Sequence, residues 1–249
     1  MISFNNINYL WIAVAIITFI ILIAFKIKAP YGRHSSNDWG VMISNKWGWF
    51  LMELPAFLLM PIISIFGPSE KNYISIILIL LWTIHYGNRT LIFPFKLKTK
   101  NKKMPVLIVI SACFFNGVNG FLNGYYIGYL SENNESLISI HVILGLFIFF
   151  TGMYINKSSD KKLISLRKNN EGYQIPKGGL FNYISCPNHL GEIIEWLGFS
   201  IIAWNIPALT FAIWTFCNLA PRSLNHHKWY KEEFKEYPKK RKALIPYIW

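Results

Sequence analysis

The sequence has little charge for its length. Only 15% of its 249 residues are charged, whereas 53% are hydrophobic and 17% are aromatic. Soluble domains carry about 25% charged residues. The composition therefore excludes an ordinary soluble domain and indicates that lipid covers the surplus apolar surface.

Cysteines and nucleotide-binding motifs are also scarce. The three cysteines are far apart, and each lies in or beside an apolar run: Cys113, Cys186 and Cys217. This spacing fits neither a metal cluster nor a disulfide framework, so we expect packing residues and no bound metal. No Gly-x-Gly-x-x-Gly follows a strand and no Walker motif is present, which excludes a Rossmann or P-loop site. Any nucleotide must be bound by other groups.

Acidic residues number 12 against 25 Lys and Arg, which gives a net charge of +13. In a soluble protein this excess would suggest a nucleic-acid partner. Here the basic residues flank apolar runs, where membrane orientation and anionic lipid account for them better. We therefore expect no nucleic-acid partner and a surrounding membrane.

Seven apolar runs are long enough, or nearly so, to cross a hydrocarbon core that needs about 20 helical residues. The sixth and seventh are short and could form a tilted hairpin, and the first lacks a basic n-region and a cleavage site, so it is a retained helix. The sequence predicts an all-α polytopic membrane protein with seven transmembrane helices in one domain, residues 1–249, because no repeat or linker interrupts it. The runs are Tyr9–Phe25, Trp47–Phe66, Tyr73–Phe95, Val106–Leu130, Leu137–Ile155, Leu190–Ala203 and Ile206–Ala220.

The basic residues alternate between the loops. Nearly all of the 25 Lys and Arg residues lie in the first, third and fifth loops and in the tail after Ala220, while the fourth loop, Ser131 to Ser136, is acidic. Since positive charge is retained on the cytoplasmic side, the N-terminus is predicted outside and the C-terminus in the cytoplasm. The membrane could be the bacterial inner membrane or the endoplasmic reticulum.

Ionisable side chains within the apolar runs are candidates for a functional site, because each is costly in a bilayer unless it faces a partner or a cavity. The third run also contains His85 and Tyr86 at helical spacing from its ionisable residue. Such groups could simply pair to hold helices together; for the whole set we favour function. The residues are Glu53, Arg89, Glu192 and Glu195.

The fourth run combines small residues with amides. Gly120, Gly124 and Gly128 form a stripe that permits close helix packing. Three amides fall on an adjacent face, where they could line a polar pocket or bond across helices. Both readings stay open for Asn116, Asn119 and Asn123.

Further polar groups gather at the predicted cytoplasmic helix ends. Their amides, carboxylates and cations have the chemistry to hold ribose hydroxyls, a carboxamide and a pyrophosphate. His226 and His227 are adjacent, so their side chains do not face one another on a helix and do not make a metal pair. The other residues at helical spacing are Asn156, Asp160 and Arg167, then Asn188, Glu192 and Glu195.

The segment IPKGGLFNYISCPNHLGEIIEW, within Tyr173 to Trp196, resembles the signature of the steroid 5α-reductase family. The resemblance covers nearly the whole chain. It extends to the YGRH sequence from Tyr31 to His34, to MELP around Glu53, to HYGNRT, to the NGxxNGYY pattern and to HHKWYKEEFKEYPKKRKALIPYIW at the end.

The resemblance implies a seven-helix membrane fold that encloses NADPH from the cytoplasmic side. It implies that the protein reduces the 4,5 double bond of a 3-oxo-4-ene steroid to the 5α product. It implies that Glu53 and Tyr86 contact the substrate carbonyl and that Asn116 and Trp196 line the pocket. We expect a monomer. The implied cofactor-binding residues are Tyr31, Arg33, Arg89, Asn156, Asp160, Arg167, Asn188, Glu192, His226 and Tyr230.

Conjugate reduction fits these residues, because negative charge develops on the enone oxygen and donors must face it. Burial favours the neutral form of a carboxyl group, so Glu53 could be a protonated donor beside the Tyr86 hydroxyl.

Two positions depart from the family pattern. Met52 stands where steroid-acting relatives often carry a polar amide, and Gln174 replaces a basic residue near the cofactor phosphates. The alternatives are a reductase of another lipophilic enone or enoyl lipid, and an S-adenosylmethionine-dependent membrane methyltransferase with a similar basic aromatic C-terminal segment. A lipid-binding scaffold protein is the third.

Overall fold

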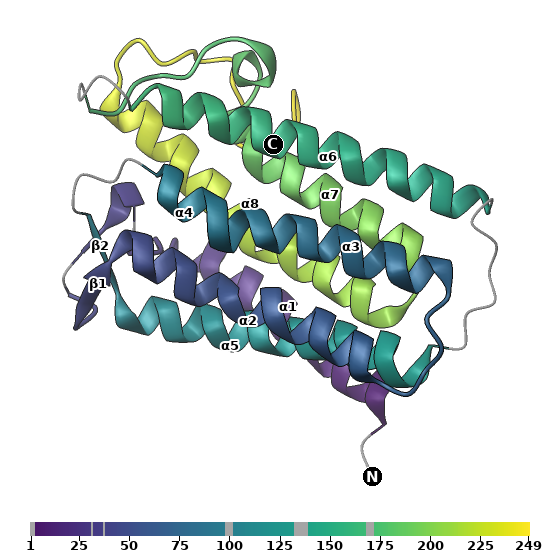
Figure 1. Ribbon diagram of the computed structural model, residues 1–249. Coiled ribbons are helices and arrows are strands. Elements are labelled where there is room, and N and C mark those ends of the chain that lie inside the picture. Colours follow the sequence, from purple (N-terminus) through teal and green to yellow (C-terminus); the bar gives the residue numbers. More distant parts are fainter. Residues whose placement is uncertain (1–2, 31, 37, 98–101, 132–138, 168–171) are drawn as a thin grey trace. The chain divides into compact units, whose positions relative to one another are not determined.

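The computed structural model describes residues 3–30, 32–36, 38–97, 102–131, 139–167 and 172–249, and the chain is mostly helical (Figure 1). Within this part of the chain, five helical segments are long and apolar enough to cross a membrane, as expected of an integral membrane protein. They are Phe4–Ala24, Asn45–Phe66, Tyr73–Lys96, Val106–Leu130 and Ile140–Ser165. Helices α7, Pro187–Ala203, and α8, Ile206–Glu233, are not among the five. Seven spans and the orientation of the termini therefore stay predictions.

Several helix ends differ from the sequence prediction. Helix α1, Phe4–Ala24, begins before Tyr9, because the Ser3 hydroxyl accepts a hydrogen bond from the Asn6 amide and caps the first turn. Helix α6, Ile140–Ser165, continues past Ile155 into polar sequence. Apolar runs mark the part of a helix that suits lipid, whereas backbone hydrogen bonds can extend the helix beyond it.

The last two helices show the same effect. Helix α7 begins at Pro187 instead of Leu190, since proline suits the first helical turn. Trp204 adopts a left-handed conformation, with φ of 46°, and ends α7. The Asn205 side chain then caps α8 by accepting from the Ala208 amide at 3.0 Å. The predicted break between the sixth and seventh runs, after Ala203 and before Ile206, is confirmed, but α8 continues well beyond Ala220.

The chain divides into two compact units, which we call unit 1, residues 1–28 with 144–249, and unit 2, residues 29–143. The expectation of one domain stays a prediction. In unit 2, α2, Asn45–Phe66, packs against α3, Tyr73–Gly87, and against α5, Val106–Tyr125. A π-helical turn, Asn88–Ile92, joins α3 to the short α4, Phe93–Lys96, and a second one, Tyr126–Leu130, follows α5.

Glycines allow α2 and α5 to approach closely. A methyl group added at Gly124 would lie 3.0 Å from the Met60 carbonyl oxygen, and one at Gly120 would lie 3.4 Å from the Ala56 Cα. At Gly128 it would overlap the backbone of Ile63. The predicted packing role of the glycine stripe is confirmed.

Two short strands connect the loops at one end of unit 2. Strand β1, Met42–Ser44, pairs antiparallel with β2, Lys103–Pro105, with Ile43 opposite Met104. The buried Met104 side chain packs over Gly48 at the start of α2. A single turn of 3-10 helix, Gly32–His34, precedes this pair.

Unit 1 is held by close contacts between its helices. Gly145 on α6 and Gly198 on α7 face one another, since a methyl group on either would lie within 3 Å of the other's carbonyl oxygen, at 2.9 and 2.7 Å. Helix α1 packs on α8, where the rings of Trp11 and Trp214 have centroids 4.8 Å apart. A 3-10 turn, Gly179–Asn182, leads into α7.

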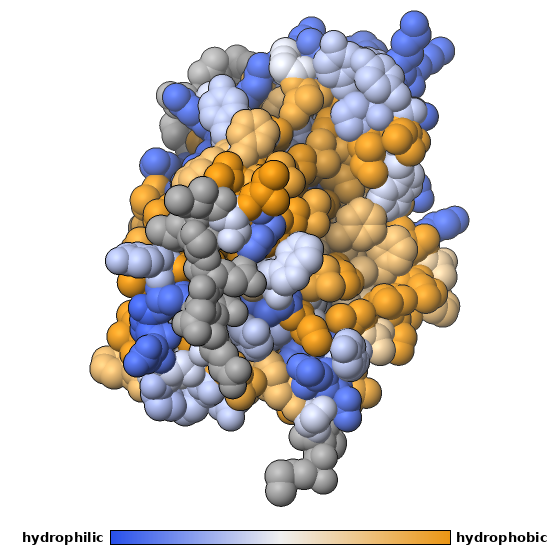
Figure 2. Space-filling view, turned by 90° about the vertical axis from the view of Figure 1, so that its right-hand side faces the viewer, coloured by the Kyte–Doolittle hydropathy of each residue, from blue (hydrophilic) through white to orange (hydrophobic). Residues whose placement is uncertain are grey.

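Hydrophobic side chains are exposed along the long helices. Phe66, Phe147 and Ile140 are 81%, 70% and 84% exposed. Figure 2 shows broad hydrophobic areas on the face that it presents. Such surface is costly in water but not beside lipid tails, which agrees with the five candidate spans.

Candidate functional site

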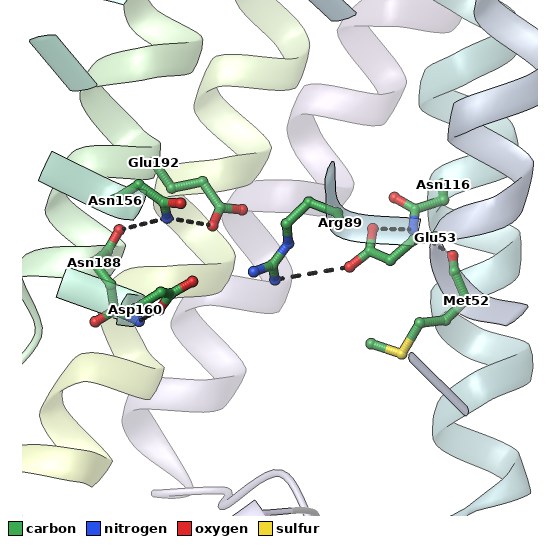
Figure 3. Close-up of polar contacts among 8 residues, drawn as sticks. All are labelled: Met52, Glu53, Arg89, Asn116, Asn156, Asp160, Asn188 and Glu192. Carbon is green, nitrogen blue, oxygen red and sulfur yellow. Dashed lines mark hydrogen bonds and ion pairs between the residues drawn. The ribbon is translucent and has the colours of Figure 1, made fainter. Parts of the chain in front are cut away.

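A buried cluster in unit 2, which we call the Glu53 cluster, joins a carboxylate, a guanidinium and an amide (Figure 3). Arg89 Nη2 lies 3.8 Å from Glu53 Oε1, and Asn116 Nδ2 donates to Glu53 Oε2 at 3.3 Å. The same amide nitrogen donates to the Met52 carbonyl oxygen. All three residues are at most 9% exposed. The cluster brings together two predicted ionisable residues and one predicted pocket residue.

The position of Arg89 is set by aromatic rings and by the π-helical turn that carries it. Its guanidinium carbon lies 4.5 Å from the Phe93 ring centroid and 5.0 Å from that of Trp49, which are cation–π distances. π-Helical turns within α-helices occur frequently at functional sites. Sequence reasoning assigned Arg89 to the cofactor, and that role stays a prediction; its observed carboxylate neighbour is Glu53.

Tyr86 is buried on α3 and packs against Trp82 and His85, with ring centroids 4.9 and 5.1 Å away. Trp82 Nε1 donates to the Ala56 carbonyl oxygen at 2.8 Å, which ties α3 to α2 one turn beyond Glu53. The two predicted catalytic residues thus lie on adjoining helices of one unit.

The three amides of α5 behave differently. Asn119 Nδ2 and Asn123 Nδ2 donate to the carbonyl oxygens of Phe115 and Asn119 in their own helix, at 2.7 and 3.0 Å. Asn116 Nδ2 donates instead to another helix, to the Met52 carbonyl oxygen and to Glu53 Oε2 of α2. The reading that amides of this face bond across helices holds for Asn116.

In unit 1 the predicted polar residues of α6 and α7 form a second group, the Asn156 cluster (Figure 3). Asn156 Nδ2 donates to the Asn188 carbonyl oxygen at 3.0 Å and to Glu192 Oε2 at 3.2 Å. Asn188 Nδ2 donates to Asp160 Oδ1 at 3.1 Å. The structure brings four predicted cofactor-binding residues together.

Glycine contacts determine the geometry of the Asn156 cluster. Gly152 of α6 and Gly191 of α7 lie so close that a methyl group on Gly152 would overlap the Glu195 amide nitrogen. A methyl group on Gly191 would likewise overlap the Asn156 amide nitrogen. The two backbones therefore touch beside the Asn156 side chain, which brings it within reach of α7.

The remaining predicted residues of this region lie apart from those contacts. Helix α6 ends before Arg167, whose guanidinium carbon lies 5.4 Å from the Tyr173 ring centroid. Glu195 is fully buried, and Trp196 packs in an aromatic core with Phe211, at a centroid distance of 4.6 Å. A pocket role for Trp196 stays a prediction.

The tail residues of α8 have separate surroundings. The His226 ring lies 5.6 Å from that of His189, and the buried Tyr230 ring stacks on Tyr237 at 5.2 Å. His227 instead contacts Ser185. The expectation that the adjacent histidines do not face one another is confirmed.

Sequence reasoning missed a third group, the Ser185 cluster of unit 1. Ser185 Oγ lies 2.6 Å from His227 Nδ1, 2.7 Å from the Tyr237 hydroxyl and 3.1 Å from the Lys242 carbonyl oxygen. Burial lowers the pKa of His227 from 6.5 to about 4, and the charges of Lys231 and Lys242 act in the same direction. Burial also raises the pKa of Tyr237. The cluster is therefore uncharged at neutral pH and joins three distant segments.

Arg241 lies beside this cluster and was also missed. It is 3% exposed, and its guanidinium carbon lies 5.2 Å from the Tyr237 ring centroid. Among the described residues, Nε and Nη1 have no hydrogen-bond acceptor. In the sequence Arg241 lies within the basic run YPKKRK. Such a run normally indicates a solvated surface, so the burial of Arg241 was not predicted.

Two predicted cofactor-binding residues, Tyr31 and Arg33, precede α2. Tyr31 lies outside the described residues, and Arg33 is in the 3-10 turn Gly32–His34, where it is partly buried.

Comparison with known proteins gives one consistent family. The family model for 3-oxo-5-alpha-steroid 4-dehydrogenase matches residues 102–249. The chain is 38% identical to steroid 5-alpha-reductase DET2 of Solanum lycopersicum over 251 residues, which is 99% of this chain and 97% of that protein. It is 36% identical to 3-oxo-5-alpha-steroid 4-dehydrogenase 1 of Bos taurus, covering 96% and 95% of the two chains. It is 40% identical to 3-oxo-5-alpha-steroid 4-dehydrogenase 2 of Homo sapiens, covering 88% and 87%.

Proposed function

Because this chain belongs to the steroid 5α-reductase family, we propose that it reduces the 4,5 double bond of a 3-oxo-4-ene steroid to the 5α-reduced 3-oxo steroid, with NADPH as the cofactor. The observation that carries the mechanism is the buried Glu53 cluster, with Tyr86 on the adjoining helix. The apolar surface of the five candidate spans suits a lipophilic substrate that arrives from the membrane.

Glu53 and Tyr86 act on the ketone. Reduction of the conjugated double bond moves negative charge onto the ketone oxygen, and hydrogen-bond donors fixed beside that oxygen stabilise it in the transition state. In this proposal a protonated Glu53 and the Tyr86 hydroxyl are those donors. Both side chains are buried, at 8% and 4% exposure, so little water competes with them.

Arg89 gives Glu53 a charge partner. At 3.8 Å the contact is an ion pair that is longer than a hydrogen bond. A ketone that bonds to the Glu53 oxygen nearest Arg89 would therefore break no short hydrogen bond between those two side chains. This supports a carboxylate that leaves Arg89, takes up a proton from water and then donates a hydrogen bond to the ketone.

The residues of unit 1 fit NADPH by their donor and acceptor types. The Asn156 cluster provides amides and carboxylates that suit ribose hydroxyls and a carboxamide. The buried guanidinium of Arg241, with two nitrogen atoms that have no acceptor among the described residues, suits a phosphate oxygen. Arg33, Arg89, Arg167, His226 and Tyr230, together with Tyr31, complete the proposed cofactor-binding set. When bound, NADPH supplies the hydride that reduces the β-carbon of the enone.

The protein is proposed to work as a monomer with seven transmembrane helices. Its N-terminus would be outside and its basic loops and tail in the cytoplasm, where NADPH is available. The membrane is the bacterial inner membrane or the endoplasmic reticulum. The excess of Lys and Arg in alternate loops supports this orientation.

The decisive test uses purified protein in detergent with NADPH and testosterone. We expect NADPH oxidation that depends on the steroid, and a 5α-reduced product in mass spectrometry. A panel with progesterone and a non-steroid enone then measures substrate preference. Absence of any 5α product, together with retention of S-adenosylmethionine, would overturn the proposal in favour of a methyltransferase.

A further inference from the structure

The geometry points to Asn116 as a positioning residue that holds one oxygen of Glu53 and leaves the other oxygen for the substrate ketone. This inference rests on the proposed role of Glu53. Asn116 was expected to line the substrate pocket; the structure gives it a more specific contact, because its amide nitrogen bonds to Glu53 Oε2 and to the Met52 carbonyl oxygen.

The two bonds of Asn116 restrict the Glu53 side chain in a way that one bond would not. A primary amide nitrogen carries two hydrogens. One points to the backbone carbonyl of Met52 and the other to the carboxylate of the next residue. The amide thus links the α2 backbone to the end of the Glu53 side chain, which limits rotation of that carboxyl group.

The contact also distinguishes the two carboxylate oxygens. Oε2 accepts the Asn116 bond at 3.3 Å, whereas Oε1 faces Arg89 at 3.8 Å. Exchange of a partner at Oε1 leaves the amide bond at Oε2 intact. Asn116 therefore keeps the carboxyl group in one orientation while Oε1 leaves Arg89, takes up a proton from water and donates a hydrogen bond to the ketone.

The close packing of α2 and α5 makes this arrangement rigid. Asn116 lies on α5 one turn before Gly120, where the two helix backbones approach closely. The amide itself is 5% exposed. A residue held by such packing can orient a reacting group to within a fraction of an ångström, and misplacement by about 1 Å can cost roughly 100-fold in rate.

The residue before Glu53, Met52, takes part in this contact only through its backbone. Met52 supplies a thioether side chain and no side-chain amide next to Glu53. Asn116 brings an amide to the carboxyl group from the neighbouring helix. Only the backbone carbonyl of residue 52 is needed for this bond, so the identity of that side chain does not limit it.

The test compares Asn116→Leu with Asn123→Leu. Both changes remove a buried amide from α5, but Asn123 donates only to its own helix at 3.0 Å among the bonds resolved here. We expect Asn116→Leu to lower kcat by about 10- to 100-fold, with the KM for NADPH within about 2-fold of wild type. Asn123→Leu should lower the unfolding temperature similarly and leave kcat within about 2-fold.

A double-mutant cycle shows whether Asn116 acts through Glu53. Testosterone binding to the protein with NADP⁺ is measured for Asn116→Leu, Glu53→Leu and the double variant, and a steroid without the 3-ketone serves as the second ligand. We expect Asn116→Leu to weaken testosterone binding in the wild-type background, but by less than about 2-fold in the Glu53→Leu background, which has no carboxyl group for the amide to hold. Binding of the deoxy steroid should not respond.

The outcomes separate this inference from the proposed function. An active wild type in which Asn116→Leu and Asn123→Leu lose equal kcat, or in which Asn116→Leu costs the same with and without Glu53, overturns the positioning role alone. Wild-type protein that reduces no testosterone overturns the proposed function and this inference together. If Asn116→Leu does not fold, Asn116→Ser, a smaller change that still removes the amide, is measured in the same cycle.

Discussion

The two units pair their carboxylates differently. In unit 2, Glu53 lies opposite Arg89, so anion and cation balance one another inside the protein. In unit 1, the Glu192 carboxylate accepts a hydrogen bond from the Asn156 amide. Carboxylates and amides can each form several hydrogen bonds, so such a group can bind further polar partners. The first arrangement suits charge that changes during a reaction, and the second suits a ligand rich in hydroxyl and amide groups.

The largest expected effect comes from replacing Glu53, the carboxyl group of the Glu53 cluster in unit 2. Glu53→Gln should lower kcat by about 10²- to 10³-fold, because one of two donors to the ketone oxygen is weakened. The KM for NADPH should stay near the wild-type value. Steady-state kinetics in detergent measure both, with the exposed Glu70→Gln of the same unit as a control. Wild-type rates in Glu53→Gln would remove this residue from the mechanism.

The pH dependence of stability tests whether the Ser185 cluster of unit 1 is uncharged. The pKa of His227 is about 4 in the folded protein, whereas the ordinary value of 6.5 applies to the unfolded chain. As the pH falls, the unfolded chain therefore takes up the proton at a higher pH than the folded protein does. Stability from this group is complete above pH 6.5 and falls by about 3 kcal/mol as the pH decreases to about 4. Thermal unfolding in detergent at several pH values measures the loss, and His227→Gln should flatten the profile. An unchanged slope in His227→Gln would contradict the assignment.

A substitution that pushes α6 away from α7 should lower the stability of unit 1 and weaken NADPH binding, although every polar residue is kept. Gly152→Ala places a methyl group against the Glu195 amide nitrogen and should cost about 1 to 3 kcal/mol of stability. It should also raise the KM for NADPH, because the Asn156 amide moves away from its partners on α7. Gly117→Ala is the matched control, since the nearest atom to its methyl group is Leu59 Cδ1 at 3.9 Å. Equal losses in both variants would remove the close approach as the cause.

The smallest expected effect comes from one amide of unit 1. Asn156→Leu removes the hydrogen bonds to Asn188 and Glu192 and should weaken NADPH binding by about 10-fold. Testosterone affinity should change much less. Fluorescence titration with NADPH measures the first and equilibrium binding the second. A larger loss for testosterone than for NADPH would reverse the assignment of the two units.

Much of the fold was predictable because hydropathy and helix-end chemistry act locally. The span Val106–Leu130, the end of α7 at Ala203 and the start of α8 at Ile206 agree with the structure. The predicted spans end at Ile155 and Ala220, whereas α6 and α8 continue into polar sequence, because apolar length reports where lipid can cover a helix and not where its backbone hydrogen bonds stop.

The site was predictable as a set of residues but not as contacts. Helical spacing identified Asn156 and Asp160, and both contact Asn188. The bond from Asn116 to Met52 joins positions far apart in the chain, and helical spacing alone did not separate Asn116 from the two similar amides of α5. Arg241 was counted with its basic neighbours, since burial depends on tertiary packing that a charge pattern does not contain.

The pairing of β1 with β2 has a mechanical consequence. The Asn45 amide donates to the Lys102 carbonyl oxygen and the Val106 amide to that of Val41, so backbone bonds extend the pair at both ends. Residues 41–45 and 102–106 must therefore shift together. Helix α5 starts at Val106 and carries Asn116 less than three turns later. A displacement of either loop would therefore move α5 and, through the Asn116 hydrogen bond, the Glu53 carboxyl group.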